Sequence, residues 1–258
     1  ANKRTKIIGN FGVGYNNIDI EIAKREGIVV TNTPHVLTDC TADIAMLLLL
    51  MSARRASEGD RLVRSGEWVG WAPTHLLGQK VTRKTLGLIG FGRIAQAMAK
   101  KAHHGFGMKI LCYAPHAPAP EILQEYEATY CATVDEVLAG ADFVSLHCPG
   151  GAATKHLINE ERLKLMRPSA HLINTARGDV VDSKALIKAL KERWIAGAGL
   201  DVYEGEPNLD PGFLKLDNVA LLPHLGSATE ETRVAMGNRV LDNIAAFFAG
   251  REPGDRVA

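Results

Sequence analysis

The sequence has little of what marks secreted, metal-dependent or membrane proteins. Its 258 residues include only 4 cysteines, and no two of them form a CxxC pair. Disulfide frameworks need many cysteines and structural metal sites need clustered donors, so we expect reduced thiols and no metal site. The longest apolar run, Ile44–Met51, is far too short to span a bilayer, so no membrane partner is expected.

An excess of charge of one sign is also missing. Lys and Arg number 30 and Asp and Glu number 29, which gives a formal net charge of +1. This balance gives no electrostatic footprint for nucleic acid, so no nucleic-acid partner is predicted. The chain opens on Ala1 rather than Met, and no secretory leader precedes the strand expected at Lys3–Gly9. We therefore expect a cytoplasmic protein whose beginning is truncated.

What the sequence does have is a regular alternation of short apolar runs and longer amphipathic ones, which starts at Thr85. The predicted strands are Thr85–Gly90, Lys109–Tyr113, Phe143–His147, His171–Thr175, Ala196–Val202 and Val219–Leu222. The predicted helices between them are Arg93–Ala102, Thr133–Ala139, Asn159–Met166 and Asp182–Glu192. Continuous apolar strands separated by helices are typical of a parallel sheet covered on both faces. The sequence therefore predicts an α/β fold with a doubly wound parallel-sheet (Rossmann) domain.

Two further stretches have a clear local character. A long helix is expected at Asp39–Arg55, and its part Ala42–Met51 is apolar almost all round, which predicts burial on every side. The proline-rich stretch Ala114–Pro120 should continue neither a strand nor a helix.

A glycine-rich turn joins the first predicted strand to the helix behind it. In Gly90-Phe91-Gly92-Arg93-Ile94-Ala95, Gly90 permits a tight turn, Gly92 lets the backbone approach a pyrophosphate, and Ala95 lets the helix pack on the strand. The pyrophosphate would lie at the helix N-terminus, where free N–H groups and the helix dipole favour negative charge. We predict a dinucleotide site in which Gly90, Gly92, Arg93 and Ile94 bind the cofactor. The alternative is a glycine-rich turn without a ligand.

The choice between NAD and NADP depends on the end of the second strand. NAD sites usually carry an acidic residue about 20 residues beyond the glycines, which binds the ribose 2′-hydroxyl. Here the strand runs out into Cys112-Tyr113-Ala114-Pro115-His116 and has no carboxylate, although no Arg stands nearby to hold a 2′-phosphate. His116 is the candidate for that contact. NADP is therefore the favoured cofactor, and NAD is the alternative.

Three later segments place polar groups at predicted carboxyl ends of strands, where a doubly wound fold carries its chemistry. They are Asn174–Asp179, Leu200–Pro207 and Leu222–Thr229. An Arg, a Glu and a His thus arrive at the edge that should hold the cofactor.

These segments resemble the D-isomer-specific 2-hydroxyacid dehydrogenase family, and the similarity runs across essentially the whole chain. The family has its Arg, Glu and His in three motifs, which appear here as NTARG, DVYEGEP and PHLGSAT. The resemblance implies that Arg177, Glu206 and His224 are catalytic. His224 would donate a proton to the keto oxygen, and Glu206 would orient its ring and favour its charged form. Arg177 would bind the substrate. The resemblance implies an NAD(P)-dependent enzyme that reduces small 2-keto acids to D-2-hydroxy acids.

The resemblance also implies further binding residues. The turn at Val13 and Gly14 would bind the substrate carboxylate through its backbone amides, together with Arg177 and His224. Asp201 would face the nicotinamide carboxamide. The other cofactor-lining residues that the family pattern implies are Cys148, Pro149, Thr154, Thr175, Ala176 and Gly226.

The expected domain organisation follows from this family pattern. Residues 35–223 would form the cofactor domain, and residues 1–34 and 224–258 would form an incomplete flavodoxin-like substrate domain from both chain ends. The family's N-terminal lobe is missing for several dozen residues.

One segment resembles a particular branch of the family. Gly66-Glu67-Trp68, followed by Trp71 and Pro73, is similar to glyoxylate/hydroxypyruvate reductases and glycerate dehydrogenases. In that branch such a tryptophan reaches the neighbouring subunit's active site, which implies a homodimer; ordinary packing is the alternative. Two other functions stay open: a nucleotide-sensing corepressor without turnover, and a D-2-hydroxyacid dehydrogenase with another substrate.

Overall fold

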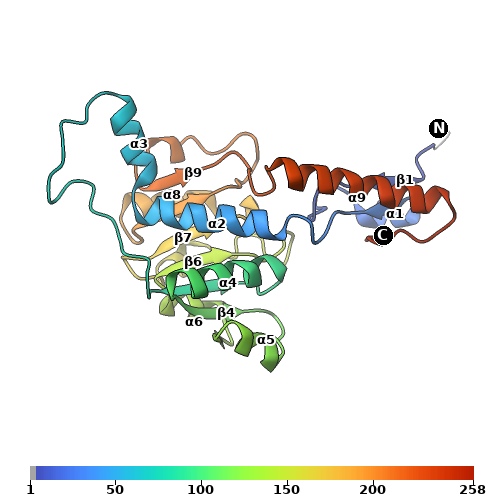
Figure 1. The fold of residues 1–258 in the computed structure, drawn as a ribbon, viewed down its shortest axis with the longest axis horizontal. Helices are drawn as coiled ribbons and strands as arrows, with labels where there is room; N and C mark the ends of the chain where they lie inside the picture. Colours follow the sequence, from blue (N-terminus) through green and yellow to red (C-terminus); the bar gives the residue numbers. More distant parts are fainter. Residues whose placement is uncertain (1–3) are drawn as a thin grey trace. The chain divides into compact units, whose positions relative to one another are not determined.

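The computed structural model describes residues 4–258, so Lys3 of the strand expected at Lys3–Gly9 lies outside the described residues. The chain divides into two compact units (Figure 1). The larger unit is Thr41–Gly226, and the smaller one combines the chain up to Cys40 with Ser227–Ala258. The boundaries between the units, after Cys40 and after Gly226, thus lie a few residues beyond the boundaries expected after residues 34 and 223.

The larger unit is built on a sheet of seven parallel strands, as predicted for a doubly wound domain. Its strand order is β5-β4-β3-β6-β7-β8-β9. The strands are β3 (Thr85–Ile89), β4 (Lys109–Tyr113), β5 (Ala128–Tyr130), β6 (Phe143–Leu146), β7 (His171–Asn174), β8 (Gly197–Leu200) and β9 (Val219–Leu221). Every residue of β6, β7 and β8 is buried, which explains why these segments read as unbroken apolar runs.

Helices cover both faces of this sheet. They are α2 (Thr38–Ala53), α3 (Ala56–Arg64), α4 (Arg93–Phe106), α5 (Pro120–Glu125), α6 (Val134–Gly140), α7 (Glu160–Leu163) and α8 (Ser183–Lys191), with short 3₁₀ turns at Gly178–Val180 and Phe213–Lys215. Side chains of α2 and α4 form one apolar core with the sheet, and those of α6, α7 and α8 form a second core. Burial on both faces is what stabilises a parallel sheet.

The strand order places a switch point beside β3. The chain runs outward from β3 to β4 and β5, and then returns to the other side of β3 as β6 (Figure 1). Doubly wound folds bind ligands at the carboxyl ends of such a pair of strands. The glycine-rich turn follows β3 at this point.

The smaller unit has its own two-stranded parallel sheet. Strands β1 (Ile7–Gly9) and β2 (Val29–Thr31) pair in register, and helices α1 (Ile20–Arg25) and α9 (Glu230–Phe248) belong to the same unit. Asp19 caps α1 and Thr229 caps α9 with their side-chain oxygens. Residues from both ends of the chain therefore build one unit.

Several local expectations were wrong. Helix α2 is not buried all round, because Leu47 is 43% exposed and Asp43 is exposed beside it. The stretch Ala114–Pro120 continues neither element, as predicted, but its last residue, Pro120, opens the unpredicted helix α5, since a helix does not need the N–H of its first residue. The helix expected at Asn159–Met166 is regular only over Glu160–Leu163.

The described residues contain neither a membrane-spanning helix nor a cluster of metal ligands. Between residues 4 and 258, no helix is both long and apolar enough to cross a membrane. In the same range, no group of three or more His, Cys, Asp and Glu side chains could hold a metal ion.

Candidate active site

The glycine-rich turn has the backbone that a dinucleotide loop requires. Gly90 has φ +89°, and a Cβ on it would lie 2.7 Å from the carbonyl carbon of His147 and 2.8 Å from the amide nitrogen of Cys148. Only glycine fits there, because the conformation is left-handed and backbone stands in the way. Ala95 is completely buried against the core, so its small size lets α4 approach the sheet.

The other side of the turn is open. A Cβ on Gly92 would meet nothing within 4 Å, and no side chain caps the N-terminus of α4 behind it. The hydroxyl of Thr175 is buried and has no hydrogen-bond partner among the described residues. An uncapped helix N-terminus, free space before it and an unpaired buried hydroxyl fit a bound dinucleotide.

The remaining predicted cofactor residues differ in what they do. Cys148 follows β6. Burial, assisted by the nearby Asp179, raises the pKa of its thiol to about 11, so the thiol is neutral. The hydroxyl of Thr154 donates to the carbonyl of Pro149 at 2.6 Å and thus serves its own loop. His116 is exposed in the loop behind β4 and makes no polar contact within the described part of the chain.

The predicted acid and its carboxylate lie together. His224 Nδ1 is 2.8 Å from Glu206 Oε2, and the amide of Tyr203 donates to Oε1 of the same carboxylate at 2.8 Å. Since a carboxylate only accepts, Nδ1 of His224 must be the donor. The other ring nitrogen has no partner among the described residues, and the side chain is 54% exposed. Glu206 thus orients a histidine whose Nε2 is available to a ligand.

A buried aspartate fixes the segment that carries His224. Asp201 is 1% exposed, and its two oxygens accept from the amides of Leu225 at 2.6 Å and Gly226 at 2.8 Å. Thr41 donates to the carbonyl of Gly226 at 3.0 Å. Burial raises the pKa of Asp201, while the two amides and the nearby His224 act in the opposite direction. Asp201 was predicted to face the cofactor, and its oxygens hold the His224 segment in place.

Arg177 lies behind β7 in a turn that its neighbours shape. The side chain of Asn174 donates to the carbonyl of Arg177 at 2.9 Å and accepts from the amide of Ala176 at 3.0 Å. Arg177 Nη1 donates to the carbonyl of Ala176 at 2.7 Å. The sequence analysis gave Asn174 no role, although an Asn at a strand end is a typical turn-forming residue.

The predicted carboxylate-binding turn belongs to the smaller unit. Asn10 donates to the carbonyls of Gly12 and Gly14, both at 3.0 Å, and Asn32 donates to the carbonyl of Val13 at 2.8 Å. Within residues 4–258, the amides of Val13 and Gly14 have no hydrogen-bond partner. The carbonyls of this turn are thus hydrogen-bonded within the unit, and the amides of Val13 and Gly14 are left free among the described residues.

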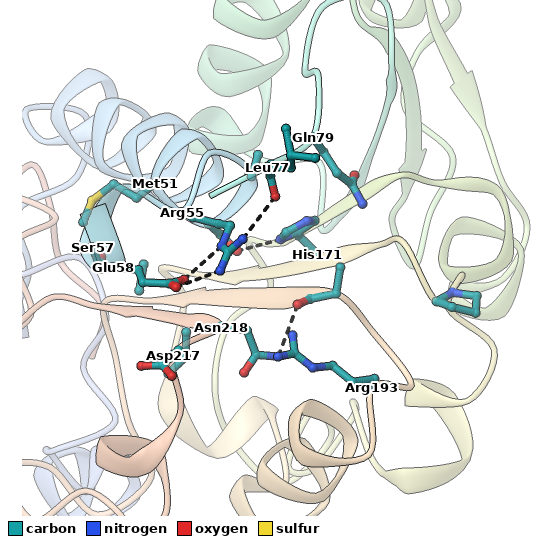
Figure 2. Close-up of a pocket in the computed structure, with 17 residues that line it drawn as sticks. Met51, Arg55, Ser57, Glu58, Leu77, Gln79, His171, Arg193, Asp217 and Asn218 are labelled. Atoms are coloured by element: carbon teal, nitrogen blue, oxygen red, sulfur yellow. Dashed lines mark hydrogen bonds and ion pairs between the residues drawn. The ribbon is translucent and has the colours of Figure 1, made fainter. Parts of the chain in front are cut away.

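A cavity of about 480 Å³ lies elsewhere in the larger unit, away from these residues (Figure 2). It is lined by the ends of α2 and α3 and by residues at the amino ends of β7, β8 and β9, among them Arg55, His171 and Asn218. None of the predicted site residues borders it. The parallel strands carry the predicted chemistry at their opposite, carboxyl ends.

Comparison with known proteins agrees with this geometry. Residues 46–226 match the family model described as D-isomer specific 2-hydroxyacid dehydrogenase, NAD binding domain. The chain belongs to this family. The predicted resemblance, the Rossmann fold and the class of NAD(P)-dependent oxidoreductase are thereby confirmed.

Three relatives of the dehydrogenase show how far the similarity extends. A glyoxylate reductase of Thermococcus litoralis is 54% identical over 98% of this chain and 77% of its own. A glycerate dehydrogenase of Hyphomicrobium methylovorum is 42% identical over 96% of this chain and 76% of its own. The crystal structure of an NADPH-dependent glyoxylate/hydroxypyruvate reductase from Sinorhizobium meliloti, in complex with NADP and malonate, has a TM-score of 0.90 at 39% identity and covers 98% of this chain and 77% of that one.

The two glycines of the dinucleotide turn should respond differently to alanine. Gly90→Ala should prevent NAD(P)H binding and destabilise the fold by roughly 1–3 kcal/mol, because the left-handed turn abuts the backbone behind β6. Gly92→Ala should leave the melting temperature unchanged, since its methyl group enters open space, but should weaken cofactor binding. Thermal melting and titration of nicotinamide fluorescence measure both. Equal melting temperatures for the two variants would contradict this account of the turn.

Proposed function

We propose that this dehydrogenase reduces glyoxylate and hydroxypyruvate to the corresponding 2-hydroxy acids, as the D-isomer where the product is chiral, with His224 as the proton donor. The observation that carries the proposal is the 2.8 Å contact between Glu206 and Nδ1 of an exposed histidine behind β9. The names of its relatives, glyoxylate reductase and glycerate dehydrogenase, support this substrate class.

The chemistry assigned to the residues is a proton-coupled reduction. The reduced nicotinamide supplies the hydride that adds to the keto carbon. As the carbonyl bond opens, negative charge develops on its oxygen, and protonated His224 donates the Nε2 proton there. Glu206 keeps the ring in the required orientation and stabilises the charged imidazolium through Nδ1. His224 is left neutral and takes up a proton from solvent.

The carboxylate of the substrate needs donors of its own. Arg177 presents a guanidinium fork that suits a carboxylate and the adjoining carbonyl. The unpaired amides of Val13 and Gly14 are proposed to bind the carboxylate as well. Their glycine-rich turn belongs to the unit formed from both chain ends, which we propose to be a flavodoxin-like substrate domain.

NADPH is the proposed cofactor, with NADH as the alternative. The loop behind β4, Ala114–Ala119, contains no carboxylate that would repel a 2′-phosphate. His116 is exposed in it and is the proposed contact to that phosphate. The solved relative from Sinorhizobium meliloti contains NADP.

A homodimer and a cytoplasmic location complete the proposal. In the extended segment behind α3, Trp68 is 53% exposed, Trp71 is 81% exposed and Leu77 is 65% exposed. Exposed apolar residues on one projecting segment are typical of a surface that a partner covers. Sedimentation equilibrium would test the dimer, and a monomer at micromolar concentration would contradict it. The four free cysteines fit a reducing compartment.

Loss of nicotinamide absorbance tests the function directly. NADH and NADPH are each combined with glyoxylate, hydroxypyruvate and pyruvate. We expect turnover of glyoxylate and hydroxypyruvate, faster with NADPH. Cofactor binding without turnover of any keto acid would contradict the proposal and favour a nucleotide-sensing protein, while preference for a bulkier acid would favour a dehydrogenase with another substrate.

A further inference from the structure

Three loops that carry candidate site residues follow the neighbouring strands β6, β7 and β8. We call residues 148–157 the cofactor loop, residues 175–181 the arginine loop and residues 201–207 the glutamate loop. The strand order places the arginine loop in the middle. Any contact between the outer two loops therefore spans the loop that carries Arg177.

The arginine loop fits closely between its neighbours. A Cβ on Gly150 of the cofactor loop would lie 2.8 Å from Cγ of Arg177. On the other side, a Cβ on Gly178 would overlap the backbone of Tyr203 and Glu204 in the glutamate loop. Two glycines thus let the three loops touch, so that a displacement of one loop changes the surroundings of Arg177.

His156 connects all three loops. Its amide donates to the carbonyl of Asp179 in the arginine loop at 2.7 Å. Its Nε2 donates to Glu204 Oε1 in the glutamate loop at 2.9 Å. His156 itself has φ +50°, a conformation that costs a non-glycine residue free energy and that surrounding contacts must hold.

We propose that His156 and Glu204 are positioning residues, which hold the loops of Arg177 and Glu206 in the arrangement needed for catalysis. This inference rests on the proposed function, and it adds two residues to the predicted site. Both side chains are just over a third exposed, so the ion pair itself adds little to global stability. Its effect lies in geometry: Glu204 stands two residues before Glu206, and the carboxylate of Glu206 accepts from the amide of Tyr203, the residue before Glu204.

Kinetics of paired variants test the proposal. His156→Leu removes the contact, and Glu204→Gln leaves only a neutral acceptor for Nε2 of His156. Each should lower kcat/KM for the keto acid about tenfold, because small displacements of catalytic groups are costly. The double variant should be no worse than His156→Leu alone, since both changes act on the same contact. His156→Gln can place an amide N–H near the position of Nε2 and should restore most of the activity. NADPH affinity should stay unchanged in all of them.

Glu127→Gln is the matched control. Glu127 also pairs with a histidine, His103, at 3.7 Å, but on the far side of the dinucleotide turn from the three loops. The same chemical change there should leave kcat/KM unaltered. A reduction equal to that of Glu204→Gln would overturn the specific role of the His156–Glu204 pair.

Hydrogen exchange gives a readout that does not depend on turnover. In Glu204→Gln, peptides spanning 148–157 and 175–181 should exchange faster than in the parent chain, although the substitution lies in the third loop. Unchanged exchange in both peptides would overturn the inference. If the parent chain reduces no keto acid, the proposed function fails, and the exchange experiment still decides whether His156 and Glu204 hold the loops together.

Discussion

His224→Gln should lower kcat for keto-acid reduction by about 10²–10⁴-fold, the usual contribution of a general acid. The glutamine amide can still donate to Glu206, so the segment that Asp201 fixes should keep its conformation. What the variant lacks is a proton that it can give to the developing alkoxide. Steady-state kinetics under saturating cofactor, with NADPH affinity measured by fluorescence, separates this loss from a binding defect.

The control is a histidine of the same chain that is also exposed. His116→Gln changes the side chain in the same way in the loop behind β4, where the residue has no polar contact within residues 4–258. It should leave kcat unchanged and affect only the KM for NADPH. If His224→Gln kept more than roughly a tenth of the activity, His224 would not be the general acid.

The strands of the sheet could be predicted from the sequence, because a strand that is buried on both faces is an unbroken apolar run. β6, β7 and β8 are buried at every residue, and their predicted positions differ from the observed ones by one or two residues at the ends. Short exposed elements leave no such pattern. β5 has three residues with only partial burial, and α5 begins at a proline, so neither was predicted.

The candidate residues were readable because each lies in a short motif directly behind a strand. Gly90 needed only local sequence and the topology of a doubly wound fold, whereas Arg177, Glu206 and His224 were predicted from the resemblance of their segments to the family. Contacts between distant segments gave no local signal. His156 and Glu204 stand 48 positions apart, and nothing in either segment indicates the other.

Asp201 has a local structural role that its place in the family motif did not indicate. Its place in the family motif predicted a contact with the cofactor. The structure shows that both carboxylate oxygens accept backbone amides of the segment that carries His224. A buried carboxylate needs such donors, so the burial of Asp201 implies this structural role. A single sequence does not show that Asp201 is buried.

Acid should unfold this protein through two histidines of the larger unit, the buried His171 and the partly buried His147. Burial lowers the pKa of His147 and of His171 from 6.5 to about 4. His171 stacks on Phe143 and contacts Ser52, and its Nε2 has no partner among the described residues, so nothing in its surroundings stabilises a charged ring. His147 lies near Ser145 and Met98, which also offer no negative charge.

The sign of the effect follows from proton binding. Between pH 6.5 and 4 the unfolded chain binds a proton at each position that the folded chain does not. The free energy of unfolding therefore has its full value, as far as these two histidines are concerned, above pH 6.5. It decreases as the pH falls, by about 1.4 kcal/mol per pH unit for each histidine. Over the whole window the two histidines together remove roughly 7 kcal/mol, which is comparable to the stability of a typical domain.

Urea unfolding at several pH values between 7.5 and 4.5 measures this dependence. His171→Asn removes one titrating group, so the free energy of unfolding of this variant should fall less steeply with acid. The Asn keeps a side-chain partner for Ser52, and at pH 7.5 the free energy of unfolding should be lower than that of the parent chain. His104→Asn, the same change at an exposed position of α4, should keep the steep dependence of the parent chain. Equal slopes for His171→Asn and the parent chain would show that His171 is not the group whose protonation opposes folding.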